Sequence, residues 1–207
     1  MPTSKTTTTK NTPQRSTKRV VSKRTTRKRV TISSIDSFPA AVRYLLDQTD
    51  FERMRVVHYN EETFKLDRMR TLLEALGDPQ DKVAMIHIAG TVGKGSTVAM
   101  LSSMLRGNGY TVGQYTSPHL TDIRERIVVN DEMISEESFT ALLKEIVAVA
   151  NKKKLTLTFF ELITAIGFKH FADEAVDIAV IETGLGGRLD STNVITDRKS
   201  TRLNSSH

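Results

Sequence analysis

The stretch Val83-Ala-Met-Ile-His-Ile-Ala-Gly-Thr-Val-Gly-Lys-Gly-Ser96 decides the fold of this 207-residue chain. Its first six residues form an almost continuous apolar run, which is typical of a strand buried in a parallel sheet. Three glycines then follow within six positions, and residues 98–105 continue as an apolar-rich helical segment. We therefore predict a strand, a tight glycine turn and a helix in direct succession.

A turn of this kind suits the binding of phosphate. Its backbone N–H groups can point at phosphate oxygens, and the following helix adds the positive end of its dipole. Lys94 can reach phosphate oxygens as a point charge, and the Ser96 hydroxyl can meet a phosphate or its Mg²⁺. The usual pattern is not matched, because Ile88 replaces its first glycine and Gly95 separates Lys94 from Ser96. The alternative is a tight turn without a ligand. The predicted nucleotide-binding residues are Gly90, Thr91, Gly93, Lys94, Gly95, Ser96 and Thr97.

Helix and strand signals alternate on both sides of this loop. Two helices are expected between residues 38 and 76, strands at 111–116 and 176–181, and a further extended piece at 124–129. Ser135 is a predicted N-cap, and residues 159–171 resemble an almost wholly buried helix. The alternation predicts an α/β fold with a doubly wound, mainly parallel sheet. Residues 90–96 and 182–187 both follow strands and should therefore meet at one rim.

Charge divides the chain into three segments. Residues 1–34 hold ten Lys or Arg, fifteen Ser or Thr and no acid, which predicts a disordered basic tail. Weak, salt-sensitive contact of this tail with nucleic acid, a plain solvated extension and a transit peptide are the alternatives. Residues 35–196, the body of the chain, carry a net charge of −6. Residues 197–207 resemble the translation of a sequencing adapter and are predicted to be non-native.

Two absences in the sequence exclude further classes of protein. The chain has no cysteine, which excludes disulfides, thiolate metal sites and thiol nucleophiles. No window approaches the roughly 20 apolar residues that a membrane-spanning helix needs. We expect a soluble, cytoplasmic monomer without a membrane partner.

Five motifs occur in the order and spacing of folylpolyglutamate synthase/dihydrofolate synthase, in the Mur ligase family. The resemblance covers about residues 38–196, and it implies that residues 35–196 are a partial ATP-binding domain of a ligase. The family usually has Asn where Val92 stands, a change that removes a side-chain amide from the loop. The motifs are His87-Ile-Ala-Gly-Thr-Val-Gly-Lys-Gly-Ser96, Tyr115-Thr-Ser-Pro-His-Leu120, Arg124-Glu-Arg-Ile127, Thr158-Phe-Phe-Glu161 and Ile181-Glu-Thr-Gly-Leu-Gly-Gly-Arg-Leu-Asp-Ser-Thr-Asn193.

The resemblance implies an ATP-dependent ligase. Such enzymes phosphorylate the carboxylate of dihydropteroate or a folate with ATP, and the amino group of glutamate then attacks the acyl phosphate. It assigns Lys94 to the phosphates and Ser117 with Glu182 to Mg²⁺, and makes Lys94 and Glu182 the catalytic residues. Other family residues lie beyond Asn193, so we expect the chain as written to be inactive as a ligase. A generic NTPase with a nucleic-acid-binding tail and another Mur-type amide ligase are the alternative functions.

The resemblance also supplies candidates for substrate contact, each with a structural alternative. His119 is a candidate for the pterin or a metal, or is an ordinary turn residue. Glu161 is a helix cap or supports the metal indirectly. Arg126 and Arg188 are candidates for anionic substrate groups, with ordinary ion pairing as the alternative.

Overall fold

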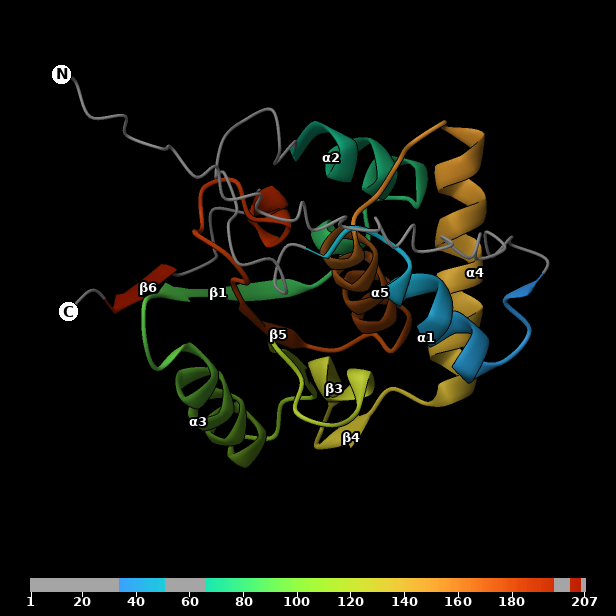
Figure 1. Ribbon diagram of the computed structural model, residues 1–207. Coiled ribbons are helices and arrows are strands. Elements are labelled where there is room, and N and C mark those ends of the chain that lie inside the picture. Colours follow the sequence, from blue (N-terminus) through green and yellow to red (C-terminus); the bar gives the residue numbers. More distant parts are fainter. Residues whose placement is uncertain (1–33, 51–65, 196–201, 206–207) are drawn as a thin grey trace, which may run out of the picture.

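The computed structural model describes residues 34–50, 66–195 and 202–205. Their strands form one six-stranded sheet in the order β4-β3-β2-β5-β1-β6 (Figure 1). Strands β2, β5, β1 and β6 are parallel, whereas β3 and β4 extend the sheet as antiparallel strands at the β2 side. The predicted α/β fold with a mainly parallel sheet is confirmed. The strands are β1 (Ala84–Gly90), β2 (Val112–Tyr115), β3 (Ile127–Val129), β4 (Glu132–Met133), β5 (Ile178–Glu182) and β6 (Arg202–Ser205).

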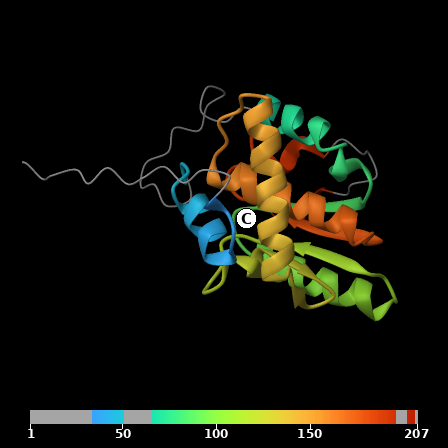
Figure 2. The same cartoon turned by 90° about the vertical axis from the view of Figure 1, so that its right-hand side faces the viewer.

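Helices cover both faces of this sheet. On one face lie α1 (Phe38–Leu46), α2 (Leu66–Ala75), α4 (Glu136–Lys152) and α5 (Phe159–Asp173), and on the other lies α3 (Lys94–Gly107) (Figure 1). Figure 2 shows α4 as a long upright helix with α1 beside it. Among the described residues, no helix is long and apolar enough to cross a membrane.

The alternation of side chains along the strands divides the core in two. Met85 of β1 and Ile181 of β5 belong to the large core under α1, α2, α4 and α5. Ile88 and Val180 face the other way and pack with Val98 of α3. Successive strand residues point to opposite faces, so nearly unbroken apolar runs are what a sheet covered on both sides requires.

The predicted helix boundaries have local causes in the structure. The Ser135 hydroxyl accepts the N–H of Ser138 at 3.0 Å at the start of α4, which confirms the predicted N-cap. Helix α5 begins in a capping box between Thr158 and Glu161. Most of α5 is buried, as its apolar composition predicted.

The extended piece expected at 124–129 is only partly a strand. Residues Ile123–Arg126 form a 3-10 turn, η4, and the strand β3 begins at Ile127. The reason is a local capping box in which Asp122 accepts the N–H of Arg124 and Glu125 accepts the N–H of Asp122. The prediction of extended backbone was therefore wrong for residues 124–126.

The structure describes four residues near the C-terminus but none of the first 33 residues. Residues 1–33, most of the predicted basic tail, lie outside the described residues, as does residue 64 of the second predicted helix. Residues Arg202–Ser205, placed outside the fold by the sequence analysis, form β6 and pair with β1 from His87 to Gly90. The non-native origin of residues 197–207 stays a prediction.

Candidate active site

The predicted phosphate loop, residues 90–96, joins β1 to α3. β1 ends at Gly90 and α3 begins at Lys94. Gly93 occupies the N-cap position with φ of 79°, a left-handed conformation that glycine adopts without steric cost. It has no side chain with which to cap the first N–H groups of the helix, and these groups are the donors that a phosphate uses. Strand, turn and helix follow each other as predicted.

Two hydroxyls of this loop have different surroundings. Thr97 donates its hydroxyl to the carbonyl of Gly93 at 2.8 Å, so this side chain closes the turn. Ser96 is exposed at the start of α3. Of the two, Ser96 is better placed for a ligand, while Thr97 stabilises the loop itself.

Glu182 lies beside the loop, at the carboxyl end of β5. Its side chain is 5% exposed, and its Oε1 lies 3.8 Å from Nζ of Lys94. Its Oε2 accepts the N–H of Ser117 at 3.3 Å. A Cβ added at Gly95 would lie 3.5 Å from the same Oε2, so the carboxylate touches the first turn of α3. The structure thus brings together Lys94, Ser117 and Glu182 from three neighbouring strand ends.

The donor atoms of this cluster suit Mg²⁺. A carboxylate and a hydroxyl are oxygen ligands, which this hard cation prefers. Among the described residues, no group of three or more His, Cys, Asp or Glu side chains could hold a metal ion. Mg²⁺ at nucleotide sites usually has one or two carboxylate ligands and keeps several waters and phosphate oxygens in its shell.

A glycine-rich loop, residues 183–193, follows Glu182 directly. Asp190 is its buried centre and accepts the N–H groups of Leu185 and Thr192. Burial raises the pKa of the Asp190 carboxyl, and the hydrogen bonds from Thr192 and Leu185 oppose that shift. Gly184 packs so closely against Phe160 that an added Cβ would lie 2.4 Å from the ring. The loop is therefore a compact, internally bonded unit at the same rim.

Comparison with known proteins gives relatives of one kind. No protein-family model matches the chain. The dihydrofolate synthase/folylpolyglutamate synthase of Bacillus subtilis is 47% identical over 135 residues, which are 63% of this chain and 31% of that protein. The dihydrofolate synthetase of Saccharomyces cerevisiae is 44% identical over 130 residues, which are 63% of this chain and 30% of that protein. The chain thus spans about a third of the length of these curated relatives.

Solved structures agree with the sequence matches. The folylpolyglutamate synthase of Thermotoga maritima has a TM-score of 0.70 and 39% identity, and the match covers 82% of this chain and 38% of that one. That of Mycobacterium tuberculosis, complexed with ADP and AMPPCP, has a TM-score of 0.61 and 38% identity over 64% of this chain and 31% of that one. A complex of such a synthase with AMPPCP and folate has a TM-score of 0.68 and 36% identity, over 77% of this chain and 38% of that one.

The chain is homologous to the folylpolyglutamate and dihydrofolate synthases. The matches confirm the family resemblance read from the five sequence motifs. They concern part of such a synthase, and the contacts of the individual site residues come from the structure of this chain.

Two residues expected to touch substrate in a synthase have other contacts here. Arg126 is 2% exposed, donates from Nε to Nδ1 of His119 at 2.9 Å and lies over the ring of Phe159. The Glu161 carboxylate accepts the N–H of Thr158 at 2.7 Å and pairs with Arg68 at 3.0 Å. The cap favours the structural alternative for Glu161, whereas these contacts of Arg126 are a hydrogen bond and a ring contact and not the expected ion pair, so its contact with substrate stays a prediction.

His119 and Arg188 keep their places as candidates. Because Arg126 donates to Nδ1 of His119, the neutral imidazole carries its proton on Nε2. Its contact with the substrate of a synthase stays a prediction. Arg188 is exposed on the glycine-rich loop, and its contact with an anionic group stays a prediction.

The turn before η4 is held by one carboxylate. Glu125 accepts the N–H groups of Leu120, Thr121 and Asp122 at 2.7 to 3.0 Å, and also the Thr121 hydroxyl. These hydrogen bonds, with that of the Thr121 hydroxyl foremost, lower the pKa of Glu125 from 4.5 to about 2. Leu120, at the tip of the turn, is 92% exposed. Glu125 was not among the predicted site residues, although it lies in the motif Arg124-Glu-Arg-Ile127.

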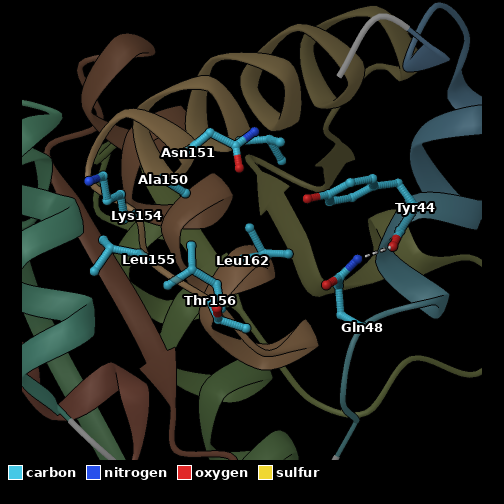
Figure 3. A pocket seen from close by; sticks show the side chains of 10 residues that line it. Tyr44, Gln48, Ala150, Asn151, Lys154, Leu155, Thr156 and Leu162 are labelled. Carbon is cyan, nitrogen blue, oxygen red and sulfur yellow. Dashed lines mark hydrogen bonds between the residues drawn. The ribbon is translucent and has the colours of Figure 1, made fainter. Parts of the chain in front are cut away.

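A separate cavity of about 230 Å³ lies among α1, α4 and α5 (Figure 3). Tyr44, Gln48, Asn151 and Lys154 are among its lining residues, and Gln48 donates to the carbonyl of Tyr44 at 2.9 Å. None of the predicted site residues lines it. The candidate site is therefore the rim formed by the phosphate loop, Ser117 and Glu182.

Proposed function

We propose that this chain supplies nucleotide-binding residues of an ATP-dependent ligase that adds glutamate to dihydropteroate or folate. The observation that carries the proposal is the approach of Lys94 Nζ to Glu182 Oε1 at 3.8 Å, beside the glycine turn and Ser117. Solved relatives are complexes with ADP, AMPPCP and folate, which supports the assignment of these ligands to the same fold.

The residues of this chain would act by positioning and by charge neutralisation. In phosphoryl transfer the charge is spread over the phosphate oxygens, so fixed positive groups lower the barrier. Lys94 and the N–H groups at the start of α3 would bind those oxygens. Lys94 pairs with Glu182 in the structure, and an incoming triphosphate would compete with that carboxylate for the ammonium group.

Glu182 and Ser117 would hold the magnesium ion of the nucleotide. When bound, Mg²⁺ neutralises phosphate charge and orients the oxygens around it. Burial of the Glu182 carboxylate limits its access to water, which strengthens its attraction for a cation. The substrate carboxylate would then accept the terminal phosphoryl group, ADP would leave, and glutamate would displace phosphate to form the amide.

The chain spans about a third of the length of its curated relatives. The experiment therefore measures nucleotide binding and not ligase activity. Isothermal titration of the full chain with AMPPCP, with and without MgCl₂, should give a complex that magnesium tightens. Glu182→Gln should abolish most of the magnesium effect, a loss of about tenfold or more in affinity. Lys94→Gln should weaken binding under both conditions.

The matched control is Glu74→Gln, which removes a carboxylate from an exposed position of α2. Its affinity should equal that of the unchanged chain with and without magnesium. The proposal fails if Glu182→Gln binds AMPPCP with the full magnesium effect, or if the unchanged chain does not bind it.

A further inference from the structure

Three buried side chains form a continuous hydrogen-bonded chain between β1 and the glycine-rich loop. His87 Nε2 lies 2.8 Å from Thr192 Oγ1, and Thr192 Oγ1 lies 2.5 Å from Asp190 Oδ1. The three residues are 4%, 0% and 3% exposed. A polar chain buried to this degree requires mutual satisfaction of its donors and acceptors, because unpaired members would carry the full cost of desolvation.

The geometry defines the direction of these hydrogen bonds. Asp190 accepts the N–H of Thr192 on Oδ1 and the N–H of Leu185 on Oδ2, so both of its oxygens act as acceptors. Thr192 therefore gives its single hydroxyl hydrogen to Asp190 and has only lone pairs left for His87. The imidazole of His87 must then donate, which places a proton on Nε2.

The same strand also holds the beginning of the loop. Thr183 donates both its N–H and its hydroxyl to the carbonyl of Ile88, at 2.9 and 3.2 Å. The loop is thus fastened to two consecutive residues of β1, at its start through Ile88 and near its end through His87. Two residues further on, β1 passes into the phosphate loop at Gly90.

We propose that His87 is a positioning residue that, through Thr192, holds the glycine-rich loop on β1 and thereby keeps Glu182 facing Lys94. Glu182 is the last residue of β5, opposite Ile88 of β1, and immediately precedes Thr183, so the loop begins directly after the residue that carries the carboxylate. The part of this inference that concerns Glu182 rests on the proposed function. The fastening of the loop does not.

The first experiment measures amide hydrogen exchange in the full chain without nucleotide. Thr192→Val removes the hydroxyl with little change of shape and should accelerate exchange of the Leu185 N–H by about tenfold or more, since a buried, paired amide becomes able to open. Thr192→Ser keeps the hydroxyl and should restore slow exchange. Thr164→Val is the matched control, because it removes a hydroxyl that is equally buried and bonded to Tyr115.

The second experiment measures the affinity of the same variants for AMPPCP in the presence of MgCl₂. Thr192→Val should weaken binding by about tenfold, the usual effect of removing a group that orients a metal ligand. Thr192→Ser and Thr164→Val should stay within about twofold of the unchanged chain. Equal affinity of Thr192→Val and the unchanged chain would overturn the inference about Glu182.

The two readouts separate the possible failures. If the unchanged chain does not bind AMPPCP, the proposed function falls, and the exchange rates alone decide whether His87 and Thr192 fasten the loop. Unchanged exchange of Leu185 in Thr192→Val would overturn that fastening. Should Thr192→Val not fold, the imidazole nitrogen shifts of the unchanged chain decide the matter. A proton on Nε2 of His87 is expected, and an unprotonated Nε2 would contradict the proposed order of donors.

Discussion

Gly184→Ala is the substitution whose effect the structure defines best. A Cβ built at Gly184 lies 2.4 Å from Cζ of Phe160 and 2.8 and 3.0 Å from the neighbouring ring atoms. Real Cβ contacts are essentially never shorter than 3.0 Å, so either the ring or the loop must move. The ring is itself held by Tyr115, with the two centroids 6.2 Å apart in an edge-on arrangement.

Two costs determine the magnitude. Forcing an extra methyl group into a packed site costs about 1–3 kcal/mol, and displacement of the ring gives up an aromatic contact worth about 0.5–1.5 kcal/mol. We expect the free energy of unfolding of Gly184→Ala to fall by about 2 kcal/mol. For a chain of this length that corresponds to a decrease of about 4–8 °C in melting temperature.

Urea unfolding and thermal melting of the full chain measure this loss. Gly107→Ala is the control, because a Cβ there meets no atom within 4 Å and the residue is the last of α3. It should be neutral or stabilise by up to about 1 kcal/mol. The double variant Gly184→Ala, Phe160→Leu should recover part of the loss. A Gly184→Ala chain as stable as the unchanged one, or no recovery in the double variant, would refute the reasoning.

Three further predictions follow from single side chains. Glu125 has a pKa of about 2 in the folded chain, below the ordinary glutamate value of 4.5, so its contribution to stability is complete above pH 4.5 and is lost as the pH falls towards 2. Glu125→Gln should therefore flatten the pH dependence of urea unfolding in that window, and an unaltered slope would contradict it. Tyr115→Phe leaves the buried hydroxyl of Thr164 without its partner and should cost about 1–3 kcal/mol in the same assay, so an unchanged midpoint would count against that bond. Val92 is 80% exposed, so Val92→Asn should change the free energy of unfolding by no more than about 0.5 kcal/mol. The same variant restores the side-chain amide and should raise the affinity for AMPPCP. Weaker binding would show that the amide does not help this loop.

Much of the fold follows from local sequence signals. The apolar runs before Gly90 and Glu182 predicted the central strands β1 and β5, and the structure pairs them in parallel with Ile88 opposite Glu182. The cap at Ser135 was likewise visible, since a hydroxyl followed by acids is a local signal. The turn η4 was missed because a cap within a few residues outweighed the apolar pattern of the strand that follows.

The candidate site likewise has features that could be predicted from the sequence and features that could not. That the loop at Gly93 and Glu182 would meet could be predicted, because the ends of parallel strands share one rim. The sequence did not reveal that Arg126 is buried against His119 or that Glu161 pairs with Arg68, 93 residues away. Burial depends on everything that packs around a side chain, and motif spacing carries no information about it.

The amino-acid sequence alone determined the strand, turn and helix around Lys94, because hydrophobic period, glycine conformation and helix capping act over a few neighbouring residues. The five motifs alone determined the family resemblance. Only the tertiary structure decided which polar groups pair inside the core. His87 and Thr192 are 105 residues apart, and their hydrogen bond exists because β1 and the glycine-rich loop pack together and exclude water. Once both groups are buried, either one would carry an uncompensated free-energy cost of desolvation without the other as a hydrogen-bond partner, and it is the packing of the fold that buries them.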